Sequence, residues 1–391
     1  MEREYDAVIV GARVAGSATA LCLARLGHRV LVVDRAPRIG DTLSTHAVLR
    51  TGVVQLTRWG LLDRVIAGGA PPSRRMVLSV DGATMPLPAD ETGRVAALYA
   101  PRRHVLDNIV LDAARRAGAD VALGTSLTGV VHDATGRVAG ARLRSTAGER
   151  IVRACFTVGA DGLRSRVAAA VGAPVLDHRP ATCAWIYTYV AGVGTGDLEM
   201  FYGSRRIAGI FPTNDGLANV YVGVPVTEAD RVRTDPDGLF HETLATISPS
   251  LAERIRAGAR VERFRVSTGL PALVRRPHGP GWALVGDAGH HKDAASGHGI
   301  SSAFRDAELL ARSLHASARG DEPERAALAG FEARRDALSH RMHEAVCGLA
   351  SLDWDGPGAI AHLATMGEAI DRECDVLWAL DTAGDTAPVA A

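Results

Sequence analysis

The chain has 391 residues, which is too long for one small core and suits a dinucleotide-binding domain with one further domain. Its 44 basic and 44 acidic residues give a formal net charge of +0, so no overall field attracts nucleic acid or an anionic membrane surface. Hydrophobic residues make up 47%, which excludes a disordered chain. Because the five cysteines form no CxxC pair and no apolar run is long enough to span a membrane, we expect a cytoplasmic protein without a disulfide framework.

Residues 5–35 predict a strand, a glycine turn, a helix and a second strand. The apolar run 6–10 leads into Gly11-Ala12-Arg13-Val14-Ala15-Gly16, and the second strand ends at an acid, Asp34. Such a turn lets a pyrophosphate approach the start of the helix, while the acid accepts hydrogen bonds from a ribose. The candidate cofactor-binding residues of this unit are Gly11, Val14, Ala15, Gly16, Asp34 and Arg35.

One residue of this turn departs from the usual GxGxxG pattern. Arg13 occupies the position of the middle glycine, and its Cβ limits how closely the backbone approaches a phosphate. Its guanidinium either pairs with the phosphates or faces solvent.

The rest of the chain predicts an α/β protein with a second sheet. Helical periodicity covers about 48–66 and 105–117, a three-stranded antiparallel meander lies between 127 and 158, and short strands run from about 180 to 268. After Asp287 the pattern is mainly helical. We expect a dinucleotide-binding domain in three pieces (1–71, 99–178 and 268–320), a substrate domain (72–98 and 179–267) and a C-terminal helical segment (321–391).

Two further motifs each place an aspartate between a strand and a helix-like run. They are Gly159-Ala160-Asp161-Gly162 and Val285-Gly286-Asp287-Ala288. An aspartate in this position accepts hydrogen bonds from the hydroxyls of a bound cofactor, or caps the helix that follows.

Together, the three motifs resemble the class A flavoprotein monooxygenases of the para-hydroxybenzoate hydroxylase type, across nearly the whole chain. The segment Asp41-Thr42-Leu43-Ser44-Thr45-His46 is similar to one in a bacterial subgroup linked to secondary metabolism. The resemblance implies a Rossmann-like FAD-binding domain of the glutathione-reductase type, a second antiparallel β-sheet domain for the substrate, and C-terminal helices. It also implies that Asp34 holds the adenosine ribose, that Asp287 holds the ribityl chain and that Asp161 supports the site.

The resemblance extends to three shorter segments. Arg50 matches an arginine placed near the cofactor, Arg103 matches one that reaches the FAD phosphates, and the loop carrying Gly297, Gly299 and Ile300 matches one whose amides approach the flavin. For either arginine alone, a surface salt bridge is the alternative. Ala294 and Ser301 replace a proline and an asparagine that are common in the family, which weakens the inference of an oxygenase more than that of FAD.

Two residues are candidates for catalysis. The resemblance implies that His46 lies near the isoalloxazine or the substrate, as a proton donor or orienting group, and the alternative is a structural histidine. Lys292, the single lysine, is either a solvated surface cation or a positive charge near the flavin or a substrate oxygen. We expect no metal site, because His290, His291, His298 and Asp293 lack a recurring ligand spacing.

Aromatic residues gather in the predicted second sheet. They either pack the sheet or form the wall of a pocket for an apolar or phenolic substrate. The candidate substrate-binding residues are Trp185, Tyr187, Tyr189, Phe201 and Phe211.

The resemblance therefore implies an FAD-dependent monooxygenase that uses NAD(P)H and O2 to hydroxylate or epoxidise an apolar or aromatic small molecule, through a flavin C4a-hydroperoxide, in natural-product biosynthesis. The resemblance also implies that NAD(P)H binds transiently without a domain of its own, which fits the absence of a second glycine-rich βαβ unit. The alternatives are a C=C reductase like the geranylgeranyl reductases and a flavin oxidase. A non-catalytic flavin sensor is disfavoured because the chain shows no obvious output domain. A halogenase is disfavoured because the segment Cys183–Thr188 does not form a W-x-W-x-I-P motif.

Overall fold

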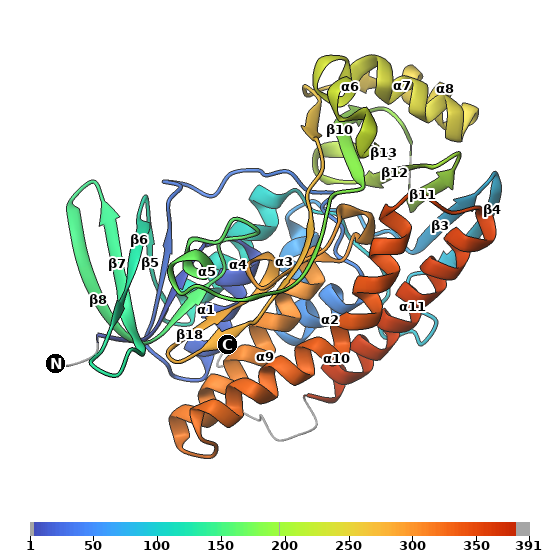
Figure 1. The fold of residues 1–391 in the computed structure, drawn as a ribbon. Helices are drawn as coiled ribbons and strands as arrows, with labels where there is room; N and C mark the ends of the chain where they lie inside the picture. The colour runs from blue at the N-terminus through green and yellow to red at the C-terminus, as the bar shows by residue number, and fades with distance from the viewer. Residues whose placement is uncertain (1–3, 195, 381–391) are drawn as a thin grey trace.

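The structure is a computed structural model that describes residues 4–194 and 196–380, and two large sheets organise its core (Figure 1). The first sheet contains the amino-terminal strand and carries the meander at one end. The second sheet lies at the other end of the molecule, beneath a layer of short helices. Long helices from the carboxyl-terminal part of the chain run along the first sheet towards the second (Figure 1).

The first sheet is built on the predicted βαβ unit, which is confirmed. Ile9 pairs in parallel with Val32 on one side and with Val158 on the other, and all three side chains are buried, as expected for a strand covered on both faces. Helix α1 (Val14–Arg25) crosses between the first two strands. The parallel strands are β1 (Tyr5–Val10), β2 (Val30–Asp34), β5 (Asp120–Leu123), β8 (Gly148–Gly159) and β18 (Trp282–Leu284).

The predicted meander is also confirmed. Strand β6 (Ser126–His132) pairs antiparallel with β7 (Val138–Ser145), and β7 pairs antiparallel with the first half of β8. The second half of β8 continues beside β1, so this strand joins the meander to the parallel sheet. Its end delivers the Gly159–Gly162 turn to the same edge as the turn after β1.

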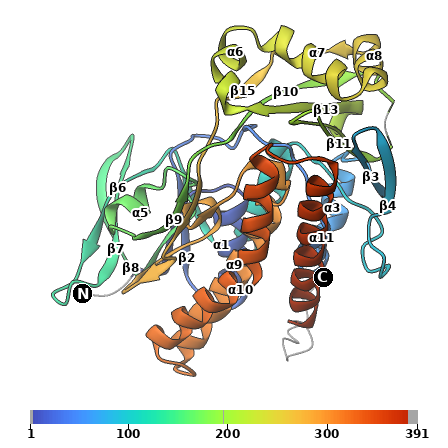
Figure 2. The same ribbon diagram turned by 45° about the vertical axis from the view of Figure 1, so that its right-hand side comes forward.

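The second sheet has antiparallel neighbours, except that β3 and β11 pair in parallel. The pattern between 180 and 268 predicted only short strands. This prediction is wrong for residues 229–257, which form helices. Two of these helices begin after the N-cap residues Asp235 and Ser248, each of which is followed by a proline that favours a helix start. These helices cover one face of the sheet (Figure 2). The elements are β3 (Arg75–Val80), β4 (Ala83–Pro88), β10 (Cys183–Ala191), β11 (Leu198–Gly203), β12 (Arg206–Pro212), β13 (Leu217–Pro225), α6 (Ala229–Thr234), α7 (Pro236–Ile247), α8 (Pro249–Ala257), β14 (Ala259–Arg260) and β15 (Arg265–Ser267).

Strand β10 divides its side chains between two cores. Ala184 and Ile186 pack with α6–α8, whereas Trp185, Tyr187 and Tyr189 belong to the main core shared with the first sheet. This alternation follows from the two-residue period of a strand. It turns the predicted row of aromatic side chains towards the other half of the molecule.

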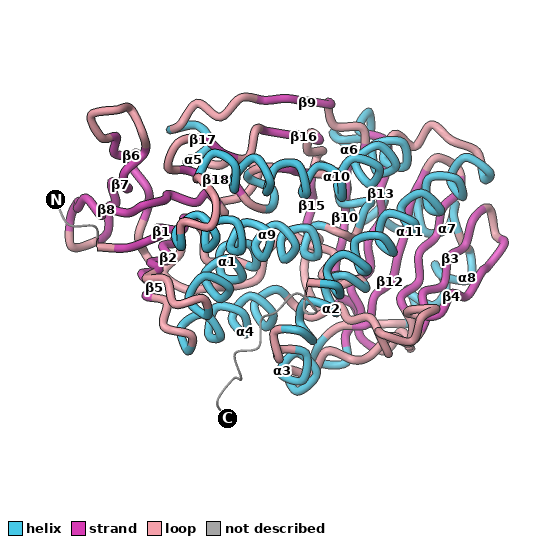
Figure 3. Tube along the Cα trace, turned by 90° about the horizontal axis from the view of Figure 1, so that it is seen from below, coloured by secondary structure: helices cyan, strands magenta, loops and turns pink. Residues whose placement is uncertain are grey.

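The remaining helices pack on and between the sheets. Helices α1, α4 (Arg103–Arg116) and α9 (Gly299–Arg319) lie side by side (Figure 3). The periodicity over 48–66 predicted one helix, but the chain breaks at Gly60, whose φ of 65° lies in the left-handed region. The other elements are α2 (Arg50–Arg58), α3 (Leu62–Ala67), α5 (Arg166–Ala170), β9 (Val175–Arg179), β16 (Ala272–Arg275), β17 (His278–Gly279), β19 (His290–His291), α10 (Glu324–Ala350) and α11 (Gly356–Ala379).

Within the described residues, no helix is both long and apolar enough to cross a membrane.

Candidate flavin site

A cavity of about 660 Å³ lies where the three glycine-and-aspartate segments meet. These segments follow β1, β8 and β18, which are neighbours in the first sheet, so the topology brings their carboxyl ends to one edge. The volume falls within the usual range for small-molecule sites. Of the candidate residues, those that line the cavity are Gly11, Val14, Ala15, Asp34, Arg35, Arg103, Asp161, Asp287, Lys292, Gly297, Gly299 and Ile300, with Trp185 and Tyr187.

Two positions in the turn after β1, Gly11 and Gly16, have no room for a Cβ atom. Gly11 has a φ of 109°, and a Cβ there would lie 2.4 Å from the carbonyl oxygen of Ala160. A Cβ on Gly16 would lie 1.8 Å from the carbonyl oxygen of Gly11, so Gly16 lets helix α1 start directly against the turn. The two glycines thus bring the backbone of α1 to the cavity edge, although Gly16 does not itself line the cavity.

The three aspartates differ in how their carboxylates are used. Asp34 accepts hydrogen bonds from the backbone N–H groups of Ala12 and Ala36, at 2.9 and 2.8 Å, which fixes it at the end of β2. Asp161 accepts from the Ser165 hydroxyl at 2.5 Å and thus also stabilises the start of α5. Asp287 is exposed to the cavity, and no group in the described part of the chain donates to its side chain. Its carboxylate is therefore open to a ligand.

Arg13 and Arg103 share one buried carboxylate. Asp107, one turn along α4 from Arg103, accepts from Arg103 Nε at 2.8 Å and from Arg13 Nη1 at 3.0 Å. Arg13 is held further by the carbonyl oxygen of Gly40 at 3.2 Å. Two guanidinium groups on one carboxylate leave a net positive charge at the cavity wall, which favours a bound phosphate. The role of Asp107 escaped the sequence analysis, although its i,i+4 spacing from Arg103 was a signal.

Neither Arg50 nor Gly286 is among the described residues that line the cavity. Arg50 pairs with Asp371 of α11 at 2.5 Å, so the salt-bridge alternative describes its contacts. Gly286, with a φ of 56°, donates its N–H to Asp306 of α9 at 3.2 Å. The first residue of the GD segment is thus tied to the helix behind it.

A buried charge network connects this helix to α11. Arg305 pairs with Asp306 at 2.6 Å and with Glu373 at 3.1 Å, and the same Glu373 carboxylate lies 3.2 Å from His298 Nε2. Burial raises the pKa of Glu373, but Arg305, followed by His298, more than reverses this and brings it down to about 2. The network joins the Gly297–Gly299 loop to the GD segment. No sequence pattern indicated Glu373, because it lies far along the chain from its partners.

His46 is fully buried and has a φ of 66°, which is unusual for a residue with a side chain. Its Nε2 is hydrogen bonded to the Tyr189 hydroxyl, and the residues flanking it, Thr45 and Ala47, line the cavity while His46 does not. Burial lowers its pKa to about 3, with Arg103 and Arg102 adding to the effect and Asp41 opposing it. His46 is therefore neutral at pH 7 and is not a charged proton donor.

Lys292 is buried against the cavity, so the interpretation as a solvated surface cation is wrong. Burial lowers its pKa to about 8; the nearby Arg305 lowers it further, and Asp306 and Glu373 oppose the change. Lys292 makes no hydrogen bond or ion pair with any group that the structure describes. Its ammonium group is thus available to a ligand.

The predicted aromatic residues divide into two groups. Trp185 and Tyr187 line the cavity, together with Tyr221, which the sequence analysis did not select. Tyr189 lies behind them on His46, and Phe211 is buried against Tyr221 with ring centroids 5.1 Å apart. Phe201 is only partly buried and packs with the core under α6–α8.

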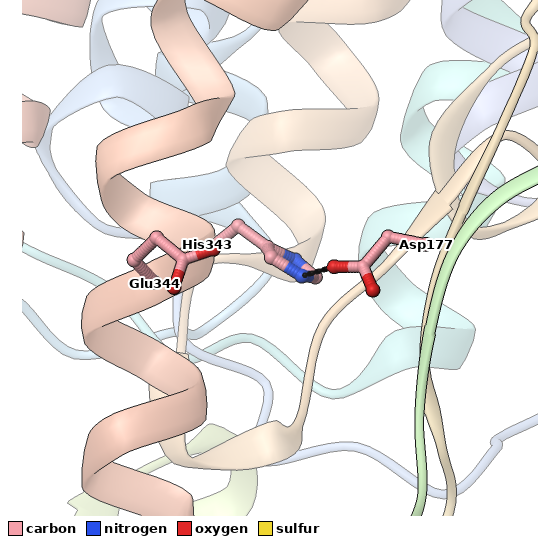
Figure 4. A group of neighbouring side chains, drawn as sticks. All are labelled: Asp177, His343 and Glu344. Carbon is pink, nitrogen blue, oxygen red and sulfur yellow. Dashed lines mark hydrogen bonds and ion pairs between the residues drawn. The ribbon is translucent and has the colours of Figure 1, made fainter.

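A separate cluster of Asp177, His343 and Glu344 has donor atoms close enough for a metal ion (Figure 4). His343 points from α10 to Asp177 of β9 and lies 3.1 Å from its carboxylate. Arg179, however, binds both carboxylates, at 3.0 Å from Asp177 and 3.0 Å from Glu344. The other ring nitrogen of His343 contacts His290 at 3.0 Å. Arginine thus takes the charge that a cation would need, and we assign no metal here.

A family model described as an FAD binding domain matches residues 4–346, most of the chain. The chain belongs to this family. The digeranylgeranylglycerophospholipid reductase of Methanosarcina mazei is 28% identical over 324 residues, covering 80% of this chain and 75% of the relative.

Two solved structures show the same fold. PqsL of Pseudomonas aeruginosa, described as a probable FAD-dependent monooxygenase, has a TM-score of 0.80 at 23% identity, covering 94% of this chain and 99% of that one. The myxobacterial chondrochloren halogenase CndH, described as FAD-dependent, has a TM-score of 0.78 at 21% identity and covers 97% of both chains.

The cavity fits FAD chemically. Its wall offers an exposed carboxylate at Asp287 for polyol hydroxyls, an anchored carboxylate at Asp34 for a ribose, and net positive charge at Arg13 and Arg103 for a pyrophosphate. The glycine geometry leaves the start of α1 open to a phosphate. The protein is an FAD-dependent oxidoreductase, as the family match and this donor set agree.

Proposed function

We propose that this chain is a monooxygenase that uses NAD(P)H and O2 to hydroxylate or epoxidise an apolar or aromatic small molecule, in natural-product biosynthesis. NAD(P)H supplies two electrons, one oxygen atom of O2 enters the substrate, and the other leaves as water. Bound FAD supplies the redox chemistry, and the protein supplies binding, orientation and a dry pocket.

The observation that carries the proposal is the aromatic wall of the cavity. Trp185, Tyr187 and Tyr221 come from the second sheet, while Gly297 and Gly299 come from the loop before α9, and all five line the same space. An aromatic or apolar substrate placed between them is flanked by large apolar surfaces on one side and by backbone on the other. This is the arrangement that a reaction on an electron-rich ring requires, because it excludes water from the reacting atoms.

Four residues have roles that follow from their placement. We propose that Asp287 and Asp34 accept hydrogen bonds from the cofactor's hydroxyl groups, since both carboxylates lie on the cavity wall. Lys292 places a cation in the same wall and stabilises negative charge that develops nearby. His46, neutral and bonded to Tyr189, orients the sheet beneath the substrate rather than donating a proton.

A reductase of C=C bonds is the second candidate. The curated relative from M. mazei, 28% identical over most of this chain, carries that activity in its name. Ala294, which replaces a proline common in the monooxygenases, lines the cavity and leaves more room there.

Anaerobic reduction followed by mixing with oxygen distinguishes the two. We expect NADH or NADPH to reduce the bound flavin, and ¹⁸O₂ to place one heavy oxygen atom in a phenolic product, as followed by mass spectrometry. Reduction of a geranylgeranyl chain without oxygen, with no labelled product from a panel of phenols, would instead support the reductase.

A further inference from the structure

A second cavity of about 630 Å³ adjoins the flavin cavity, on the side of α10 and α11. Leu270 and Asp293 line both cavities and therefore lie at the partition between them. Apolar residues in the wall of the second cavity include Ala272, the first residue of β16, and Ala345 and Ala350 of α10. Nothing in the binding of FAD accounts for this space.

Asp293 has an unused hydrogen-bond acceptor at the partition. Its Oδ1 accepts from the indole N–H of Trp185 at 3.1 Å and from the N–H of Ala295 at 2.9 Å. No group in the described ranges donates to Oδ2, although the residue is only 7% exposed. Asp293 lines both cavities, so this oxygen is open to a ligand there, and burial of the residue raises the pKa of its carboxyl to about 6.

The outer end of the second cavity carries one cation and two carboxylates, so its net charge is negative. Arg179 lies at this end, where Glu344 and Asp177 each approach its guanidinium to 3.0 Å. The side chains of Arg179 and Glu344 are 37% and 47% exposed, so they mark the side open to solvent. Because Arg179 is already paired, this end offers little attraction for an anionic group.

We propose that the two cavities form one substrate site, in which an elongated, uncharged molecule places a phenolic hydroxyl against Asp293 and extends its apolar tail between α10 and α11. The hydroxyl donates to the free oxygen of Asp293, next to Trp185 on the flavin side. The tail occupies the space lined by Ala272, Ala345 and Ala350. This assignment rests on the proposed function, since it specifies the substrate class for that same site.

A dinucleotide such as NADP+ fits this space poorly. It carries phosphates, and the single arginine at the outer end is neutralised by Asp177 and Glu344. The inner end carries a carboxylate, which repels phosphate. Competition by NADP+ therefore serves as an outcome of the test.

The test uses the FAD-loaded protein and a series of 4-alkylphenols, from phenol to 4-octylphenol, with binding followed by the flavin absorbance change. In the wild type, we expect affinity to rise about two- to four-fold for each added methylene, as burial of one CH2 predicts. Ala345→Phe fills the second cavity, so the gain with chain length should disappear while phenol still binds. Ala364→Phe, at an exposed position of α11, is the matched control and should keep the gain.

Two further variants keep the proposal open to contradiction. Thr365→Phe fills the cavity from α11 instead of α10 and should also remove the chain-length gain, in case Ala345→Phe fails to fold or to retain flavin. Asp293→Asn should weaken all members of the series about ten-fold, independent of chain length, because the hydroxyl loses a charged acceptor.

Either of two results would overturn the proposal: a wild type whose affinity does not rise with chain length, or filled variants that retain the rise. Displacement of 4-octylphenol by NADP+ would also overturn it. These outcomes are independent of oxygen transfer, because binding is measured without NAD(P)H. A chain-length gain without any oxygenated product would leave the two-cavity site intact and remove the monooxygenase proposal, whereas oxygenated phenols without the gain would do the reverse.

Discussion

The two halves of the flavin cavity are held together in different ways. The half that faces the first sheet is made of backbone turns and carboxylates whose positions follow from short motifs, such as the turn from Gly11 to Gly16. The half that faces the second sheet is made of side chains, such as Trp185 and Tyr221, that come from strands paired over long distances in sequence. The residues of the cofactor half can therefore be predicted from the sequence, whereas those of the substrate half are predicted less well. The experiments below test where this division holds, from the largest expected effect to the smallest.

The strictest requirement of the cofactor half is the backbone at Gly11. Gly11→Ala places a Cβ against the Ala160 carbonyl, at a backbone position with a positive φ. We expect the free energy of unfolding to fall by about 3 to 5 kcal/mol and the protein to lose its bound flavin. Gly27→Ala is the matched control, because Gly27 has a φ of 85° but open space around it; it should cost only about 1 to 2 kcal/mol. Urea denaturation and the flavin absorbance measure both. Equal losses in the two variants would show that the close approach to Ala160 does not matter.

The buried charges behind the cofactor half should be nearly as important. Glu373→Leu leaves Arg305 with one carboxylate partner instead of two in a buried site, so we expect a loss of about 3 kcal/mol. Glu368→Leu, on the same helix, removes an exposed pair with Arg341 and should cost about 0.5 kcal/mol or less. Chemical denaturation of both variants gives the comparison. A Glu373→Leu protein as stable as Glu368→Leu would mean that α11 does not support the flavin loop.

The sequence predicted most of the cofactor half because local chemistry dictates it. A strand, a glycine turn and an acid at Asp34 specify their own geometry, and the GD and DG motifs follow the ends of neighbouring strands. The contact between Asp107 and Arg103 could have been predicted in the same way, because the two residues lie one helical turn apart. Glu373 was not, because its partner Arg305 is on another helix and only packing brings the two together.

The substrate half was predicted less well for the same reason. The alternation in β10 correctly turns three aromatic residues to one face, but it does not reveal that Trp185 and Tyr187 reach the cavity while Tyr189 stops at His46. Nor does the sequence reveal that β13 adds Tyr221 beside them, since that depends on strand pairing. The helices over residues 229–257 were missed because strands on both sides dominated the pattern.

A smaller effect is expected at the base of the substrate half. Tyr189→Phe removes the hydroxyl bonded to the buried His46, leaving a ring nitrogen without a partner, so stability should fall by about 1 to 2 kcal/mol. Tyr5→Phe removes an exposed hydrogen bond to Asp120 and should cost about 0.5 kcal/mol or less. Thermal unfolding of the two variants measures the difference. If Tyr189→Phe were neutral, His46 would not depend on the second sheet.

The pH dependence of turnover tests whether the charge on Lys292, in the cavity wall, contributes to the reaction. Since its pKa is lowered to about 8, Lys292 carries its charge below that pH and loses it as pH rises through 8. We expect turnover to fall over this interval in the wild type, whereas Lys292→Arg should hold its rate to higher pH and Lys292→Met should show no such fall. Steady-state rates measured from pH 6 to 10 at a fixed concentration of phenol distinguish these profiles. A wild-type pH profile identical to that of Lys292→Met would show that the charge on Lys292 does not contribute to turnover.

The most direct measurement of the central claim, that three distant segments hold one FAD in this cavity, is the flavin content of Asp287→Ala. Asp287 has no partner among the described residues, so its loss should leave the fold intact while removing a charged acceptor for the cofactor's hydroxyls. We predict an unchanged melting temperature of the apoprotein and an FAD affinity about ten-fold or more weaker, by titration. A variant that is purified with as much flavin as the wild type, and binds it as tightly, would contradict the placement of FAD described above.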